Sequence, residues 1–143
     1  MNKYLVFDAS YAVRIVTDHK DRPVCKALME RQLDEGYVFY APSLWLYEVT
    51  STINKLARFG ELTETEGLAA LKSASTLNAQ LVMPDETMAL QAFHWTRQLN
   101  RAAAYDSFYL ALAQQLSCDL WTADKRLVNA VRQPWVRLAT AQT

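Results

Sequence analysis

The sequence has 143 residues, of which 51% are hydrophobic, and it contains only three glycines and four prolines. A chain of this length can bury the core of one domain, and its composition excludes a disordered or fibrous protein. Fifteen basic residues balance fifteen acidic ones. The overall charge therefore counts against binding of nucleic acid by bulk attraction, and contact with a nucleic acid would need local basic residues or a partner subunit.

The cysteines and the apolar runs bear on the compartment of the protein. Cys25 and Cys118 lie far apart, and the chain leads into the apolar run Tyr4–Phe7 without a secretory signal. No apolar run approaches the roughly 20 residues that a membrane-spanning helix needs. We therefore expect a reduced, cytoplasmic protein without membrane association, whose cysteines pack as small hydrophobic side chains.

The first forty residues predict two strands separated by two helices. The apolar run Tyr4–Phe7 stops at a charged residue, as a short buried strand would. A brief helix is expected over 11–17, and a second helix with apolar residues at helical spacing ends at Gly36. Val38–Ala41 is the second strand, and Pro42 stops it.

Two further helices are predicted in the middle of the chain. Ser43 is a candidate N-cap for a long helix over Leu44–Phe59. Thr63, with Glu66 three residues later, forms a capping-box pattern that opens a helix over 64–76.

The rest of the chain continues the alternation of strands and helices. Gln80–Met83 predicts a third strand, and Asp85 caps a helix that runs to about Asn100. Tyr105–Ser117 is an alanine-rich helix whose apolar face includes Tyr105. A fourth strand, a short helix and a fifth strand are expected at 119–122, 124–131 and 135–138.

The alternation of short strands with helices implies βαβ units and a mainly parallel sheet. We expect one α/β domain over residues 1–143, with three α/β/α layers and a sheet of four to five short strands. No linker, internal repeat or low-complexity tract divides the chain.

Four acidic residues fall where sites form in open parallel sheets, near the carboxyl ends of strands. Asp8 ends the first strand, Asp124 follows the fourth, and Asp106 lies in the first turn of the helix that leads into the fourth strand. Asp8 and Asp124 could simply cap helices, and Asp106 could simply complement a helix dipole. Glu48 is harder to explain as a purely structural residue, because its apolar neighbours place it near the interior, where a carboxylate needs a partner.

Several carboxylates in one place repel each other, so they hold a cation or keep some protons. With two histidines and no nearby cysteine ligands, the cation would be hard and oxygen-loving, as Mg²⁺ and Mn²⁺ are. Such an ion activates water and neutralises charge on a phosphodiester, and whether one or two ions bind stays open. His94, between Phe93 and Trp95, is expected to be structural.

The four segments that carry these acids resemble the motifs of PIN domains. They are Leu5–Val13, Pro42–Val49, Ala104–Ala113 and Leu120–Leu127. They occur in the family's order along the whole chain, and the third and fourth are the most specific. A compact PIN domain of this size is most similar to the VapC-type toxins, which are ribonucleases held inactive by a cognate antitoxin.

The resemblance implies a Mg²⁺- or Mn²⁺-dependent endoribonuclease, the toxin of a type II toxin–antitoxin pair. Its partners would be RNA and a cognate antitoxin, and a homodimer is expected. All four acids would be catalytic: Asp8 and Asp106 as the main metal ligands, and Glu48 and Asp124 completing the site directly or through water. Asn129 stands where some relatives place a further acid, so no fifth carboxylate is predicted.

Ser10, Lys125 and Arg126 are predicted to contact the substrate. Ser10 could instead steady Asp8 or cap a helix, and Lys125 and Arg126 are favoured because they adjoin the fourth acid. Thr122 could hydrogen-bond within the site or be an ordinary strand residue. Other basic candidates for phosphate contacts are Arg14, Lys55, Arg58 and Arg101.

Two other functions stay open. A catalytically silent PIN-like module would bind protein or RNA, and loss of an acid would favour it, but all four are present. A phosphatase fits worse, because Asp8-Ala9-Ser10 lacks a second Asp two positions on.

The helix pair over 43–76 is expected to contribute to an antitoxin or dimer contact. The four tryptophans could stack on bases, but packing is the expected role of Trp45, Trp95, Trp121 and Trp135.

Overall fold

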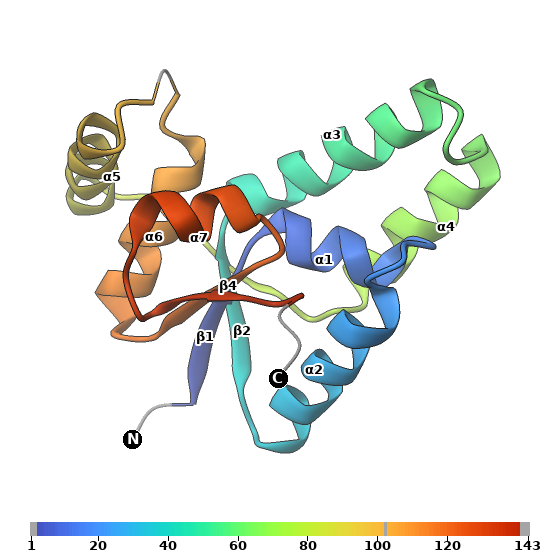
Figure 1. Ribbon diagram of the computed structural model, residues 1–143, viewed down its shortest axis with the longest axis horizontal. Helices are drawn as coiled ribbons and strands as arrows, with labels where there is room; N and C mark the ends of the chain where they lie inside the picture. Colours follow the sequence, from blue (N-terminus) through green and yellow to red (C-terminus); the bar gives the residue numbers. More distant parts are fainter. Residues whose placement is uncertain (1–2, 102, 141–143) are drawn as a thin grey trace.

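The computed structural model describes residues 3–101 and 103–140, in which strands alternate with helices (Figure 1). The strands are β1 (Tyr4–Phe7), β2 (Val38–Pro42), β3 (Gln80–Val82), β4 (Asp119–Thr122) and β5 (Val136–Leu138). The helices are α1 (Ala9–Val16), α2 (Arg22–Asp34), α3 (Leu44–Arg58), α4 (Glu64–Ser75), α5 (Glu86–Gln98), α6 (Tyr105–Leu116) and α7 (Lys125–Val131). Each predicted strand and helix is present in these residues, with shifts of a residue or two at most ends.

The strands form one five-stranded sheet in the order β3-β2-β1-β4-β5, and every described pairing is parallel. The chain moves outward from β1 to β3, then crosses back to place β4 on the other side of β1. Val6 of β1 pairs with Tyr40 of β2 and with Leu120 of β4. The order therefore reverses between β1 and β4, and ligand sites form at such a switch point, outside the carboxyl ends of the strands.

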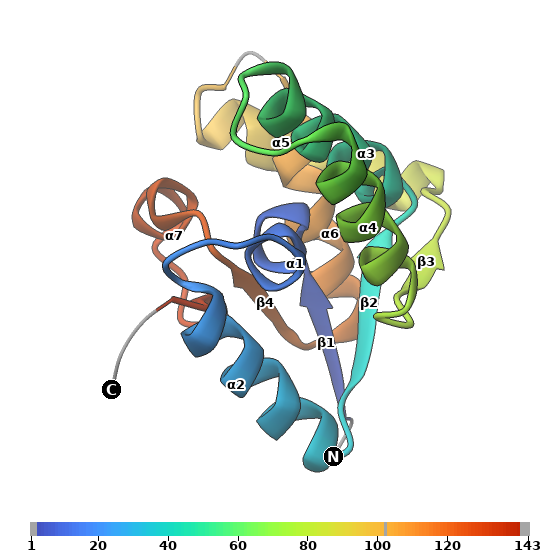
Figure 2. The ribbon, with the colours of Figure 1, turned by 90° about the vertical axis from the view of Figure 1, so that its right-hand side faces the viewer.

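Helices cover both faces of the sheet, which confirms the three-layer α/β/α prediction (Figure 2). α6 packs on β1, β2 and β4, and α5 lies against the outside of α6. α1 lies on the opposite face, with α2, α3 and α4 packed around it. The buried side chains between these layers include Val6, Phe7, Leu110 and Leu120, each at most 1% exposed. The predicted domain bounds, 1–143, extend into residues outside the described part and stay a prediction.

Two of the three predicted N-cap residues make the expected capping bonds, and one does not. Thr63 and Glu66 exchange both bonds of a capping box, and Asp85 accepts from the backbone N–H of Met88 at 2.8 Å. Ser43 precedes α3 as predicted, but its side chain makes no capping bond. Its backbone is already helical (φ −56°, ψ −26°), whereas a capping side chain needs an extended N-cap residue.

Tyr105 is the clearest error in the predicted core. Its position among the apolar residues of α6 predicts burial, yet 65% of it is exposed. It stands in the first turn, at the end of α6 beside the carboxyl ends of the strands, whereas Tyr109 one turn later is buried. Helical spacing assigns a residue to a face of the helix, but it does not say how far the neighbouring layer extends along that face.

α3 and α4 form a hairpin that projects from the body of the molecule (Figure 1). Exposed apolar side chains on or beside it include Leu46, Tyr47, Phe59 and Leu68. Both cysteines are unpaired: Cys25 is fully buried, as predicted, and Cys118 is half-buried. Within the described residues no helix has the length and apolar character that a bilayer span requires.

Candidate functional site

The four predicted acids come together in one pocket at the switch point. Asp8 follows β1, Asp124 lies two residues after β4, Glu48 lies in the second turn of α3, and Asp106 opens α6. The pocket has a volume of about 200 Å³. It is lined by Asp8, Ala9, Ser10, Val13, Arg14, Glu48, Thr52, Asp106 and Asp124. The structure therefore brings the four acids together, and their catalytic and metal-binding roles stay predictions.

Asp8 is the most buried of the four acids, with 7% of its surface exposed. Its Oδ1 accepts from the Ser10 hydroxyl at 2.6 Å and from the backbone N–H of Tyr11 at 3.1 Å. Its Oδ2 accepts from the Thr122 hydroxyl at 2.5 Å. Burial raises the pKa of Asp8 to about 6 despite these bonds, and the charge of Asp106 adds to the rise.

The Ser10 and Thr122 hydroxyls connect β1 to β4 at this carboxylate. Ser10 Oγ accepts from the backbone N–H of Ala123 at 2.9 Å, and Thr122 Oγ1 accepts from the N–H of Asp124 at 3.0 Å. Of the two predicted roles of Thr122, the structure therefore shows the hydrogen bond within the site. Ser10 steadies Asp8, and Asp8 rather than Ser10 caps α1; a contact of Ser10 with substrate stays a prediction.

Glu48 is held by a residue that the sequence did not indicate as part of the site. Tyr109 Oη donates to Glu48 Oε1 at 2.6 Å, across 61 residues of sequence. Burial raises the pKa of Glu48, the bond from Tyr109 lowers it, and the charges of Asp106 and Asp8 raise it further. The signal for Tyr109 was its place three residues after Asp106, which puts both on one side of α6.

Asp106 and Asp124 are more open to solvent. Burial raises the pKa of Asp106, the Arg101 guanidinium lowers it, and the charge of Asp124 raises it. Arg101 Nη1 lies 3.5 Å from Asp106 Oδ2. Asp124 Oδ1 accepts from the backbone N–H groups of Arg126 and Leu127, so the helix-cap reading of Asp124 is also correct. Capping occupies only one of its two oxygens.

The electrostatics of the pocket favour a cation. Burial is the largest cause of the raised pKa of Asp8, Glu48 and Asp106, and mutual repulsion adds to it in each case. Four oxygen-bearing carboxylates suit a hard divalent ion such as Mg²⁺ or Mn²⁺. Among the described residues, no three acidic, histidine or cysteine side chains are already grouped to hold a metal ion. The carboxylates share a pocket without forming a closed coordination shell.

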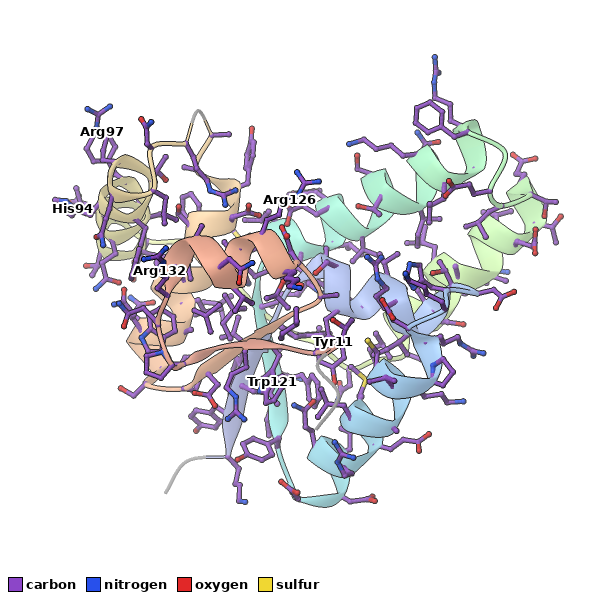
Figure 3. The ribbon with its side chains drawn as sticks, in the orientation of Figure 1. Tyr11, His94, Arg97, Trp121, Arg126 and Arg132 are labelled. Carbon is purple, nitrogen blue, oxygen red and sulfur yellow. The ribbon has the colours of Figure 1, made fainter. Side chains whose placement is uncertain are left out.

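The predicted phosphate-binding residues divide by position. Arg14 lines the acid pocket, and its Nε is buried without a hydrogen-bond partner, although Asp21 lies 3.8 Å away. Arg101 lies beside Asp106. Lys125 and Arg126 are exposed at the start of α7 and are not among the described lining residues. Figure 3 shows Arg126 at the end of α7 that faces α3.

The four tryptophans and His94 are not among the described residues that line the acid pocket. His94 is exposed on the outer side of α5 (Figure 3). Trp45 and Trp95 are buried, as the packing interpretation predicts. Trp121 is half-buried under the guanidinium of Arg137, 4.7 Å from the ring centre, and Trp135 packs edge-on against Trp95.

Tyr109→Phe is expected to lower about 10- to 100-fold any activity that uses Glu48 as a metal ligand, because groups that orient a metal ligand contribute that much. The substitution removes one hydroxyl and leaves Glu48 without its 2.6 Å donor. Tyr11→Phe is the matched control: Tyr11 is also buried, but its hydroxyl donates to Gln32 at 2.8 Å, between α1 and α2 (Figure 3). Rates and thermal unfolding of both variants measure the effect; equal loss of activity in both would contradict a specific role for Tyr109.

Comparison with known proteins agrees with this architecture. A family model described as PIN domain matches residues 5–132. Ribonuclease VapC9 of Mycobacterium tuberculosis is 34% identical over 97 residues, which cover 68% of this chain and 73% of that protein.

Two solved structures share the fold at low sequence identity. Mycobacterium tuberculosis VapC20, described as a sarcin–ricin loop cleaving toxin, has a TM-score of 0.67 at 14% identity and covers 88% of this chain and 94% of its own. VapBC2 from Rickettsia felis, bound to a DNA fragment from its promoter, has a TM-score of 0.66 at 13% identity. The match covers 94% of this chain and 96% of the VapBC2 chain. With the family match over most of its length, the chain belongs to the PIN-domain family.

Proposed function

We propose that this protein is a metal-dependent endoribonuclease, the toxin of a type II toxin–antitoxin pair, that hydrolyses RNA phosphodiesters. The observation that carries the proposal is the convergence of Asp8, Glu48, Asp106 and Asp124 on one pocket at the switch point of the sheet. The 34% identity to a protein named as a VapC ribonuclease supports the same chemistry and substrate class. The VapBC2 complex supports a cognate antitoxin as partner.

The metal is Mg²⁺ or Mn²⁺ in this proposal, with Asp8 and Asp106 as the main ligands. Glu48 and Asp124 complete the site directly or through water. When bound, the ion supplies an activated water and neutralises charge on the phosphodiester. The chain's own residues orient the ligands: Ser10 and Thr122 fix the carboxylate of Asp8.

The substrate contacts proposed for this site lie within the pocket and beside it. Ser10 is within the pocket, and Lys125 and Arg126 adjoin it at the start of α7. Arg14 supports the same role, because it lines the pocket with a buried Nε that lacks a hydrogen-bond partner. The net charge of the protein is zero and gives RNA no bulk attraction, so these local cations would supply the positive charge that the phosphates need.

The antitoxin contact is proposed for the α3–α4 hairpin, and a homodimer is proposed as the assembly. The hairpin projects from the body and exposes apolar side chains such as Leu46 and Leu68, which suit an amphipathic partner helix. The cytoplasm is the proposed compartment, in keeping with unpaired Cys25 and Cys118.

Purified protein is expected to cleave RNA internally when Mg²⁺ or Mn²⁺ is supplied and to stop when EDTA removes the ion.

Asp106→Asn is expected to abolish cleavage while thermal unfolding shows a folded domain, because Asp106 is half-exposed and the substitution creates no cavity. Cleavage is followed by gel electrophoresis of end-labelled RNA. The catalytically silent alternative predicts RNA or protein binding without cleavage under any divalent ion, and that result would overturn the proposal.

A further inference from the structure

A second pocket lies directly beside the acid pocket. It has a volume of about 380 Å³ and is lined by Glu48, Arg101, Ala103, Tyr105 and Asp106. Glu48 and Asp106 line both pockets, so the second is continuous with the proposed catalytic site. Its size falls in the range of pockets that hold small ligands or parts of larger ones.

Tyr105 presents an uncovered aromatic ring next to the acids. It immediately precedes Asp106 in the first turn of α6, and 65% of it is exposed. Core packing does not account for this side chain, in contrast to Tyr109 on the same helix, which is 1% exposed. Because Tyr105 lines the second pocket, its ring is available to whatever enters there.

Arg101 adds a positive charge to the same pocket. Its Nη1 lies 3.5 Å from Asp106 Oδ2, and 31% of its side chain is exposed. An ion pair of this length and exposure contributes little stability, so the guanidinium is free to turn towards an anion. Arginine offers a fork of N–H donors that matches a phosphate group.

An aromatic ring and a guanidinium beside the proposed catalytic acids match the chemistry of one nucleotide. We infer that Tyr105 and Arg101 form a nucleotide subsite in which an unpaired RNA base stacks on the Tyr105 ring and Arg101 contacts the adjacent phosphate. The inference rests on the proposed ribonuclease function and deepens it. A ring can stack only on a base whose face is free, so the substrate is single-stranded RNA or a loop rather than a duplex.

The test measures affinity for a short single-stranded RNA by fluorescence anisotropy in EDTA, where no cleavage is expected. Tyr105→Ala is expected to bind roughly fivefold to 150-fold more weakly, the range for loss of one base–aromatic stack. Tyr105→Phe keeps the ring and is expected to bind like the wild type. Phe59→Ala is the matched control, because Phe59 is an aromatic residue, 75% exposed, just beyond the far end of α3 from Glu48.

Arg101→Ala is tested through the salt dependence of the same affinity. Loss of one phosphate contact is expected to reduce the slope of log Kd against log salt by about 0.7 for a single strand. Arg31→Ala is the control, since Arg31 is exposed on α2 and lines a different pocket, with Tyr4 and Asp119 at the other end of the sheet. A duplex of the same sequence should bind more weakly than the single strand and should not respond to Tyr105→Ala.

The failure of this inference can be told from the failure of the proposed function. If the wild type cleaves no RNA with either ion, the ribonuclease proposal fails. If it cleaves RNA, but Tyr105→Ala retains wild-type affinity, the subsite is wrong. Equal weakening by Tyr105→Ala and Phe59→Ala, or equal weakening on duplex and single strand, also overturns the subsite. Thermal unfolding of each variant checks that the exposed substitutions leave the fold intact.

Discussion

Asp8→Asn is expected to reduce RNA cleavage about a thousandfold, because stabilisation of transition-state charge by a metal ion is worth several kcal/mol. The substitution keeps the size of the side chain and removes its charge, so the pocket stays filled while a ligand is lost. An amide at this position has one carbonyl oxygen in place of two carboxylate oxygens, and the hydroxyls of Ser10 and Thr122 both donate to the present carboxylate.

The measurement is the cleavage rate of end-labelled RNA at saturating Mg²⁺ or Mn²⁺, with Asp34→Asn as the matched control. Asp34 is the last residue of α2 and is exposed, so the same chemical change there should leave the rate unaltered. Circular dichroism should show the same helix content in both variants. Cleavage by Asp8→Asn at the wild-type rate would remove Asp8 from the catalytic site.

The metal-free protein is expected to lose stability as the pH rises from about 4 to 7. The pKa of Asp8 is about 6 in the folded protein and near 4 in an unfolded chain. Between these values the folded state holds a proton that the unfolded state has released, so the free energy of unfolding falls with rising pH. The largest contribution from Asp8 is about 3 kcal/mol, and Glu48 and Asp106 act in the same direction.

Denaturant titrations in EDTA at pH 4.5 and 7.5 measure this loss, and Asp8→Asn isolates it. The variant has no proton to release at this position, so it should be more stable than the wild type at pH 7.5 and closer to it at pH 4.5. The difference in free energy of unfolding between wild type and variant cancels the contributions of other titrating groups, such as His19, whose pKa is lowered. Mg²⁺ should restore more stability at pH 7.5 than at pH 4.5. If the wild type, relative to Asp8→Asn, is more stable at pH 7.5 than at pH 4.5, the predicted effect of the Asp8 proton is wrong.

The sequence was sufficient to predict the elements and the four acids, because those predictions rest on local patterns. Apolar runs, the capping box at Thr63 and the helix cap at Asp85 each reflect interactions within a few residues. The proximity of Asp8 and Asp124 was also predictable, since the carboxyl ends of parallel strands meet at one edge of a sheet.

The contact that holds Glu48 was not predictable, because it joins residues far apart in the chain. The bond from Tyr109 to Glu48 depends on how α6 approaches α3, and no local pattern encodes that distance. Exposure of Tyr105 depends on where the sheet and α5 stop covering α6. Ser43 failed as a capping side chain because its own backbone adopts helical angles, which depend on the preceding strand.

The position of β4 beside the central strand β1 has a consequence for synthesis of the protein on the ribosome. β1 is made first, but one of its two neighbours in the sheet is β4, and the hydroxyl of Thr122 reaches Asp8 across 114 residues. Pairings of such long range form slowly and late. A nascent chain that has not yet emerged as far as Thr122 lacks both the donor that fixes Asp8 and the fourth acid, Asp124. We therefore expect the proposed toxic activity to arise only once nearly the whole domain has been released.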